Sequence, residues 1–464
     1  MHTLRRKLIG DREFYKMAMQ VAIPIIVQNG ITNFVNMLDN IMVGRVGTEP
    51  MSGVAIVNQL MFVFNICIFG AISGAGIFTA QFWGCDKQEG VRHTFRFKWI
   101  ISAIIGVIGV LLFAFAGEEL AMLYLQGEAN QADALVTLEY AKEYLAVIVF
   151  SMIPFAMEQV YVSTLRECGE TVLPMKAGMT AVLVNLVFNY LLIYGKFGFP
   201  ELGVQGAAIA TVLARCVEAT IVIVWTHTHK EKNPYIVGIY RSFYIPWSLV
   251  QKILIKGTPL MVNECAWSLG MATLMQCYSY RGLEAVAALN ICTTIANVFN
   301  VVYLSMGSAV AIIVGQLLGA GKMEEAKDTD TKLIAFSVML CLGIGMLLGL
   351  TAPLFPQVYN TTQSVRSLAT DLIRILAIVM PMHAFLHSAY FTLRSGGKTI
   401  ITFLFDSVFM WVASIPFAFV LSRYTALPMA PMYFAIQAIE IIKCIIGFVL
   451  IKKGVWLQNI VVEE

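Results

Sequence analysis

The sequence predicts an all-α polytopic membrane protein with twelve transmembrane helices in two pseudo-symmetric six-helix lobes. Composition is the first observation: of 464 residues, 58% are hydrophobic and 13% charged, and the mean hydropathy is +0.74. Soluble globular domains carry about 25% charged residues. The apolar residues also form long blocks such as IISAIIGVIGVLLFAFA (100–116), close to the roughly 20 residues that cross a bilayer as a helix. The third observation is an internal repeat that relates the two halves of the chain.

The twelve expected helices follow from the apolar runs. Several runs are longer than a bilayer requires, so those helices should tilt or extend beyond it. The basic N-terminal segment MHTLRRKLIGDREFYK is followed by no short apolar run with a small-residue cleavage site, so we expect the first helix to be retained. The predicted spans are 14–40, 51–82, 94–117, 140–163, 172–195, 203–227, 250–279, 286–318, 333–356, 372–393, 399–422 and 430–451.

The distribution of Lys and Arg predicts the orientation. Cytoplasmic loops of membrane proteins are enriched in these residues. With both termini in the cytoplasm, most of the 32 basic residues fall in the N-terminal segment, the even-numbered loops and the tail, while Arg215 and Lys443 lie within spans. The opposite side carries acidic residues such as Glu118 and Glu119. We therefore expect a multi-pass protein of the cell inner (cytoplasmic) membrane with both termini cytoplasmic.

The two halves share the order and spacing of many residues. One constant shift carries Pro24 onto Pro259 and Gly84 onto Gly319 without a gap. Because each half holds an even number of spans, both halves have the same orientation, and an axis along the membrane normal relates them. The expected domains are an N-terminal lobe (1–227), a cytoplasmic linker (228–249) and a C-terminal lobe (250–464).

Four short motifs occur in a fixed order along these spans. LDNIMVGRVG leads out of the first span, TLRECGET (164–171) and TLRSGGKT (392–399) follow the fourth and tenth, and NLVFNYLLIYG lies in the fifth. With the six-plus-six spans, they resemble the multidrug and toxic compound extrusion (MATE) family of secondary transporters, bacterial type. The resemblance covers nearly the whole chain. It implies two six-helix lobes and cation-driven efflux of organic, often cationic, compounds.

The segment QNGITNFVNMLDN (28–40) places amides and a carboxylate inside an otherwise apolar span. Its Asn residues are three or four positions apart, so they share one face of a helix, with Asp39 beside them. A carboxylate in mid-span costs roughly 2.5–3.5 kcal/mol on insertion, and such residues usually face a cavity or a partner. The alternative is that the amides only hydrogen-bond neighbouring helices.

Asn185 and Asn189 lie four residues apart and therefore present two amides on one face of the fifth span. In the MATE family, an acidic residue of the first helix and polar residues of the fifth form a cation-responsive site, so the resemblance places Na⁺ or H⁺ at Asp39. Some members carry Asp where this chain has Asn189, so only one carboxylate is expected here. The N-lobe candidates for cation and substrate binding are Gln28, Asn36, Asp39, Asn185 and Asn189.

The C-lobe candidates are Glu264, Asp406, His383 and His387. Glu264 resembles an acidic position that binds the cation in the Na⁺-linked branch of the family, so Na⁺ is possible there too. Asp406 lies in FLFDSVFMW, apolar on both sides. The two His residues are four apart in the tenth span. Without a third ligand we expect a polar cavity lining and no metal site.

The remaining polar residues have structural interpretations. Arg215 and Glu218 are three residues apart in the sixth span and should neutralise each other. The nine cysteines are scattered singly, with no CxxC and no Cys/His cluster, so neither a disulfide framework nor a bound metal is predicted. No cofactor is expected beyond the coupling ion.

These features predict a secondary active transporter: Na⁺- or H⁺-coupled antiport that exports organic, often cationic, drugs or toxic metabolites by alternating access. The alternative is a flippase or exporter of a lipid-linked or other dedicated endogenous substrate, which would need a strongly basic cavity. An intramembrane enzyme would need clustered Asp-rich or His/Asp motifs, which the sequence lacks, so we expect no enzyme. The expected partners are organic cations, a monovalent cation and the lipid bilayer, with no nucleic acid, and the chain should be a monomer.

Overall fold

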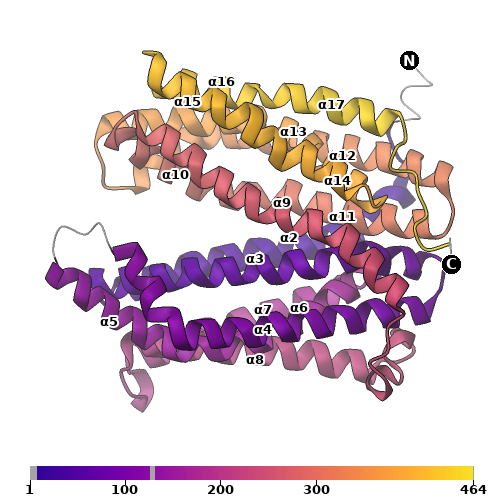
Figure 1. Ribbon diagram of the computed structural model, residues 1–464. Helices are drawn as coiled ribbons and strands as arrows, with labels where there is room; N and C mark the ends of the chain where they lie inside the picture. The colour runs from indigo at the N-terminus through magenta and orange to yellow at the C-terminus, as the bar shows by residue number, and fades with distance from the viewer. Residues whose placement is uncertain (1–7, 126–130, 463–464) are drawn as a thin grey trace. The chain divides into compact units, whose positions relative to one another are not determined.

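The computed structural model describes residues 8–125 and 131–462, and every regular element in these residues is a helix (Figure 1). The predicted all-α class is confirmed. The long helices of the first half are α2 (Arg12–Gly44), α3 (Thr48–Gly84), α4 (Gln88–Leu125), α5 (Gln131–Ile148), α6 (Met152–Glu167), α7 (Val172–Ile193) and α8 (Gly203–Thr228). The α-helices of the second half are α9 (Trp247–Ser279), α10 (Leu283–Phe299), α11 (Val301–Gly319), α12 (Met323–Thr351), α13 (Gln363–Ser395), α14 (Thr399–Phe403), α15 (Ile415–Tyr424), α16 (Met429–Ala438) and α17 (Glu440–Lys452).

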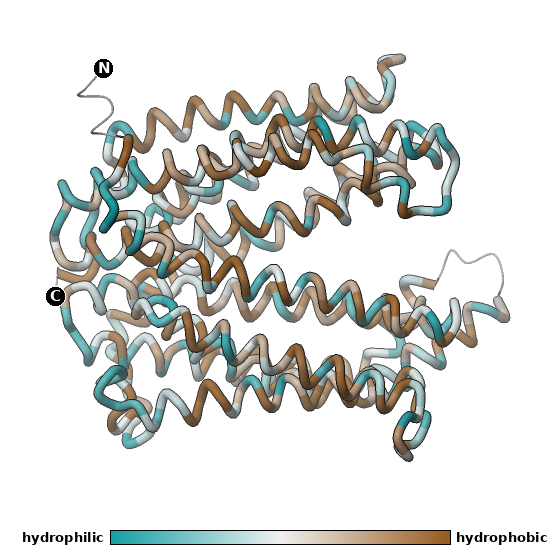
Figure 2. The backbone as a smooth tube through the Cα atoms, turned by 180° about the vertical axis from the view of Figure 1, so that it is seen from behind, coloured by the Kyte–Doolittle hydropathy of each residue, from teal (hydrophilic) through white to brown (hydrophobic). Residues whose placement is uncertain are grey.

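Eleven helical segments in the described part of the chain are long and apolar enough to cross a membrane. Helix α9 is long enough but is not among the eleven; it carries Lys252, Lys256 and Glu264. The predicted span 286–318 is built from α10 and α11, which are separated at Asn300. Figure 2 shows hydrophobic residues along the helices and hydrophilic residues gathered in the connecting segments. The chain is a multi-pass membrane protein.

Two of the predicted spans contain helical turns of other types. In the span 140–163, a short 3₁₀ turn (Val149–Ser151) separates α5 from α6. Pro154 follows it, and proline has no N–H to donate to the preceding turn. In the span 399–422, two π-helical segments, η7 (Leu404–Val408) and η8 (Met410–Ser414), lie between α14 and α15. Such π turns are rare and frequently mark functional sites.

The helices form two compact units. The N-terminal unit comprises 27–79 and 88–253, and the C-terminal unit comprises 1–26, 80–87 and 254–464. Helices α2, α3 and α9 therefore each begin in one unit and end in the other. This division follows internal contacts, whereas the transport lobes 1–227 and 250–464 remain a prediction.

Each unit has its own apolar core. In the N-terminal unit, α3 and α6 bury side chains such as Val57 and Met152, both 0% exposed. In the C-terminal unit, α13 contributes Leu372 and Ile373, also 0% exposed, to a cluster with α10 and α16. These cores hold in place the helices that carry the polar residues of each unit.

A reciprocal crossing joins repeat-related residues inside the C-terminal unit. A Cβ atom on Gly84 would collide with the backbone carbonyl of Gln316, and a Cβ on Gly319 would collide with that of Gln81. The constant shift that carries Gly84 onto Gly319 also carries Gln81 onto Gln316. The two backbones therefore approach closely because both positions lack a side chain.

The segment that follows α17 binds to this crossing. Gln81 accepts a hydrogen bond from Ile460 N at 2.8 Å and donates from Nε2 to Ser395 O at 2.9 Å and to Gln458 O at 3.2 Å. Trp456 is fully buried. The end of α3, the end of α13 and the C-terminal segment are thus joined through one buried amide.

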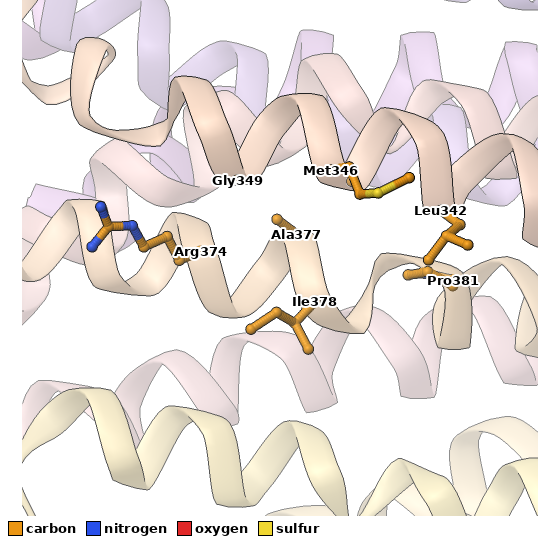
Figure 3. Close-up of a pocket in the computed structure, with 8 residues that line it drawn as sticks. Leu342, Met346, Gly349, Arg374, Ala377, Ile378 and Pro381 are labelled. Carbon is orange, nitrogen blue, oxygen red and sulfur yellow. The ribbon is translucent and has the colours of Figure 1, made fainter.

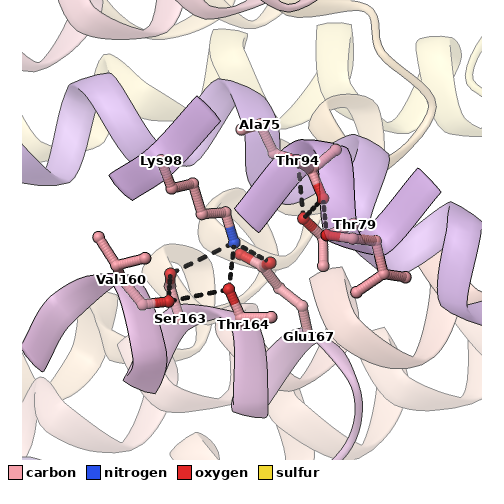
Figure 4. A network of polar contacts seen from close by, with 9 residues as sticks. Ala75, Thr79, Thr94, Lys98, Val160, Ser163, Thr164 and Glu167 are labelled. Carbon is pink, nitrogen blue, oxygen red and sulfur yellow. Dashed lines mark hydrogen bonds and ion pairs between the residues drawn. The ribbon is translucent and has the colours of Figure 1, made fainter. Parts of the chain in front are cut away.

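A buried lysine organises α4 and α6 in the N-terminal unit (Figure 4). Lys98 is 0% exposed, forms an ion pair with Glu167, and donates to Thr164 Oγ1 at 3.1 Å and Ser163 Oγ at 3.3 Å. A Cβ on Gly76 would collide with the Glu167 carboxylate, so glycine on α3 leaves the space that this group occupies. The motif TLRECGET therefore carries a partner for a buried cation.

Candidate functional site

A small polar cavity lies among α2, α7 and α8 in the N-terminal unit. Its volume is ≈ 70 Å³. The three helices each contribute polar side chains: α2 carries Asn36 and Asp39, α7 carries Asn185, and α8 carries Thr211. The full lining is Thr32, Val35, Asn36, Asp39, Gly178, Ala181, Val182, Asn185, Thr211, Ala214, Arg215 and Glu218.

The carboxylate of Asp39 is held by the fifth predicted span. Asn189 donates from Nδ2 to Asp39 Oδ1 at 2.6 Å. The Asn185 amide forms most hydrogen bonds when its nitrogen points toward Asp39. In this orientation the nitrogen lies 2.9 Å from Asp39 Oδ1 and 3.1 Å from Asp39 Oδ2, and the Asn185 oxygen accepts from Thr211 Oγ1 at 3.3 Å. The spacing of Asn185 and Asn189 on α7 thus directs both amides at one carboxylate.

One acceptor in this cluster has no donor. Asn189 is 1% exposed, and its Oδ1 atom accepts no hydrogen bond from the residues that the structure describes. Asp39 belongs to none of the ion pairs found among these residues. A buried carbonyl oxygen without a donor normally has a partner such as water or an ion. Hard cations are bound by carboxylate and amide oxygens of this kind.

The cavity lining also includes a neutralised pair. Arg215 Nη1 lies 3.0 Å from Glu218 Oε2, which confirms the predicted pairing. Gln28 does not line the cavity but accepts from Arg166 Nη2 at 2.5 Å. A Cβ on Gly178 would lie 3.1 Å from Gln28 Nε2 and 3.3 Å from Glu218 Oε1, so glycine at this position leaves room for both side chains.

The size of the cavity limits what it can hold in this state. A water molecule occupies about 30 Å³ of liquid, whereas pockets for drug-sized ligands measure about 300–1,000 Å³. A cavity of ≈ 70 Å³ therefore has room for a monovalent cation with water and not for an organic drug.

The C-terminal unit contains a half-buried carboxylate, Asp406, with a different environment. Asp406 lies on the π-helical segment η7, where Oδ1 is 2.8 Å from Lys443 Nζ and Oδ2 accepts from Asn263 Nδ2 at 3.2 Å. Lys443 also lies 3.4 Å from Glu440 Oε2 on the same helix, α17. This carboxylate is therefore already paired with a cation of the protein.

The other C-lobe candidates lie near this ion pair. His383 Nε2 is 3.1 Å from Gln437 Oε1, and the rings of His383 and His387 lie 6.1 Å and 4.8 Å from the ring of Tyr303. Glu264 has Arg394 and Asp406 as charged neighbours. No group of three or more His, Cys, Asp and Glu side chains suited to a metal occurs in the part of the chain that the structure describes.

A larger hollow lies between α12 and α13 (Figure 3). Its volume is ≈ 430 Å³, and its lining includes Gly345, Gly349 and Ala377, with Arg374 at one end. Its rim residues Met346 and Ile378 are 60% and 68% exposed. Since it holds none of the predicted site residues and its rim is apolar, we assign it to the surface that faces the hydrocarbon of the bilayer.

Comparison with known proteins identifies the family. The MatE family model matches residues 24–191 and 259–420, which together make up more than half of the chain. This chain belongs to the MatE family. One match falls in each half, as the internal repeat predicts. The family consists of membrane transporters that carry out multidrug efflux, and the predictions of a transporter and of no enzyme are confirmed.

Individual relatives agree over almost the full length. A probable multidrug resistance protein NorM from Thermotoga maritima is 24% identical over 456 residues, which cover 97% of this chain and 95% of that protein. A probable multidrug resistance protein YoeA from Bacillus subtilis is 25% identical over 419 residues, 87% of this chain and 86% of that protein.

Solved structures show the same fold. A MATE protein crystallised in the bent conformation matches with a TM-score of 0.83 and 22% identity over 97% of this chain and 96% of that chain. A MOP superfamily transporter from Pyrococcus furiosus matches with a TM-score of 0.83 and 21% identity over 97% and 98%. For that protein, a reversed polarity of the binding pocket suggests a different function.

Sequence reasoning missed several residues of both sites. Thr211 and the cavity-lining glycine Gly178 give no signal in the sequence, because Thr and Gly are common in membrane spans. Asn263 adjoins Glu264, which is the more conspicuous residue in the sequence, and Glu440 lies between two isoleucines at the start of α17. Lys443 gave a signal, since a cation inside a span usually has a buried partner, but the sequence does not name that partner.

Proposed function

We propose that this chain is a cation-coupled antiporter that exports organic, often cationic, compounds across the cytoplasmic membrane, and that Asp39, Asn185 and Asn189 bind the coupling ion. The observation that carries the proposal is the cavity at Asp39. It presents a carboxylate that belongs to no ion pair among the described residues, together with an amide oxygen, Asn189 Oδ1, that accepts no donor from them. Membership of a multidrug efflux family supports the organic substrate.

The surroundings of Asp39 favour exchange of a small cation. Two amides already donate to the carboxylate, which lowers the cost of keeping it charged inside a span. Its negative charge is not cancelled by Arg215, because that guanidinium is paired with Glu218 at 3.0 Å. A proton or Na⁺ can therefore supply the missing positive charge and leave again when the site opens.

Coupling needs two conformations with different ligand preferences. A ligand shifts the equilibrium between two states only by its difference in affinity for them. If the coupling ion binds at Asp39 in one state and the organic cation binds better in the other, each ligand promotes release of the other. The small volume of the cavity in this structure is consistent with the ion-binding state.

Efflux of a fluorescent organic cation from loaded vesicles tests the proposal. An inward Na⁺ gradient and, separately, an inward proton gradient are imposed, and one of them should accelerate efflux by wild-type protein. Asp39→Asn keeps the volume and removes the charge, so it should abolish the acceleration at normal expression. Glu119→Gln is the matched control, because it removes an exposed carboxylate from α4 outside the cavity, and it should behave as wild type. Gradient-driven efflux by Asp39→Asn at the wild-type rate would contradict the proposed role.

A further inference from the structure

Lys443 lies inside a transmembrane helix of the C-terminal unit and faces two carboxylates. Its ammonium is 2.8 Å from Asp406 Oδ1 and 3.4 Å from Glu440 Oε2. The side chains of Lys443, Asp406 and Glu440 are 8%, 19% and 15% exposed. A cation inside a span is costly, roughly 2.5–3.5 kcal/mol at the centre of a helix, and is retained where it has a buried partner.

All four oxygens of these carboxylates have a partner within the C-terminal unit. Asp406 Oδ2 accepts from Asn263 Nδ2 at 3.2 Å, and Glu440 Oε1 accepts from Ser414 Oγ at 3.1 Å. The remaining two oxygens, Asp406 Oδ1 and Glu440 Oε2, face Lys443. The ring of Phe405 lies 5.4 Å from the ammonium and covers it on another side. The carboxylate cluster of this unit is therefore fully coordinated.

The contrast with the N-terminal unit is one of charge. Asp39 has amide donors and belongs to no ion pair among the described residues, whereas Asp406 has an amide donor and an ammonium. The two carboxylates thus differ mainly in the presence of a covalently attached cation. An attached group competes at a high effective concentration with any free ion.

We propose that Lys443 is a tethered counter-cation that occupies the position of a mobile coupling ion in the C-terminal unit, and that ion exchange is thereby restricted to Asp39. This inference rests on the proposed function. It makes Lys443 a specificity-determining residue: it decides whether Asp406, in addition to Asp39, binds a free monovalent cation. Its removal should uncover a second cation site formed by Asp406 and Glu440.

A purely structural role for the triad makes a different prediction. Removal of one partner from a buried ion pair destabilises a protein whatever ions are present. A tethered counter-cation additionally predicts that free Na⁺ restores stability to the variant, because a ligand that binds only the folded state raises the melting temperature progressively as its concentration exceeds the dissociation constant.

Thermal unfolding of purified protein tests this in an Asp39→Asn background, which silences the N-terminal site. Melting temperatures are measured in increasing NaCl against choline chloride at equal ionic strength. Asp39→Asn alone should show no Na⁺-specific shift, and addition of Lys443→Gln should produce an upward shift that grows with the Na⁺ concentration. Lys443→Arg, which keeps the charge, and Lys453→Gln, which removes an exposed lysine just after α17, should produce none.

If Lys443→Gln fails to fold, Lys443→Met combined with Glu440→Gln leaves the net charge of the triad unchanged and still uncovers Asp406, so it should show the same Na⁺-specific shift. Absence of a shift in the folded variant would overturn the inference, as would an equal shift with Lys443→Arg. Failure of the proposed function gives a different result: neither a Na⁺ gradient nor a proton gradient would accelerate efflux by wild-type protein in vesicles. That result does not depend on how the variants at Lys443 bind Na⁺.

Discussion

The Lys98→Met substitution should destabilise the protein strongly, and the structure fixes both the sign and the size of the effect. Lys98 is 0% exposed, and its ammonium reaches the Glu167 carboxylate, Thr164 Oγ1 at 3.1 Å and Ser163 Oγ at 3.3 Å. Methionine fills a similar volume but donates no hydrogen bond. The Glu167 carboxylate, which is 16% exposed, would lose the cation beside it. Removal of one partner from a buried pair costs about 3–5 kcal/mol.

A second substitution separates charge from packing. Glu167→Gln in the same chain removes the carboxylate that Lys98→Met leaves behind, so the double variant should be more stable than Lys98→Met alone by about 1–3 kcal/mol. The matched control is Lys142→Met, whose partner Glu118 lies 2.9 Å away in an exposed pair with 50% and 45% accessible side chains. Exposed pairs contribute less than about 1 kcal/mol.

Equilibrium unfolding in mixed detergent micelles, followed by far-ultraviolet circular dichroism, provides the free energies. Lys98→Met should lie well below Lys142→Met, with the double variant between Lys98→Met and wild type. Equal stability of Lys98→Met and Lys142→Met, or a double variant less stable than Lys98→Met, would refute the reasoning from the buried ion pair.

Two further predictions rest on particular contacts and a third on the predicted orientation. Gly319→Ala should lower the melting temperature, because the added Cβ would collide with the backbone of Gln81. Gly343→Ala is the control and should leave the melting temperature unchanged, because the space around its Cβ is open. Equal melting temperatures of the two variants would contradict the close crossing. Asn189→Ala removes the amide oxygen Oδ1, the proposed second ligand of the coupling ion, and should weaken Na⁺ binding roughly tenfold. Ion titration of transport measures this, and an unchanged affinity would exclude Asn189 Oδ1 from the site. Cysteines that replace Lys87 and Lys322 should react with an impermeant thiol reagent from the cytoplasmic side, and labelling from outside would reverse the predicted orientation.

The helices were largely predictable from the sequence because apolar blocks report directly on membrane spans. The breaks inside those blocks were not. Two π-helical segments follow α14, yet this region is as apolar as a continuous helix. A break of this kind depends on packing against neighbouring helices, which periodicity does not record.

The two sites differ in how far the sequence predicts them. Asp39 and Asn189 were found because a carboxylate and paired amides are conspicuous in apolar spans, and the structure brings them to 2.6 Å. The partner of Asp406 was not found, because Lys443 lies on a different helix and the sequence gives no rule for which spans meet. Long-range pairing between helices is a property of the packed fold, and it changes the expected chemistry of the second site.

Reverse coupling in sealed vesicles is the measurement that tests cation-coupled antiport most directly. An outwardly higher concentration of an organic cation is imposed with Na⁺ and protons initially at equilibrium, and movement of each ion is followed with a selective indicator. We predict that the entering organic cation drives one of these ions out against its own developing gradient, and that Asp39→Asn abolishes this movement. Entry of the organic cation with no uphill ion movement in the wild type, or equal ion movement in Asp39→Asn, would contradict the proposal.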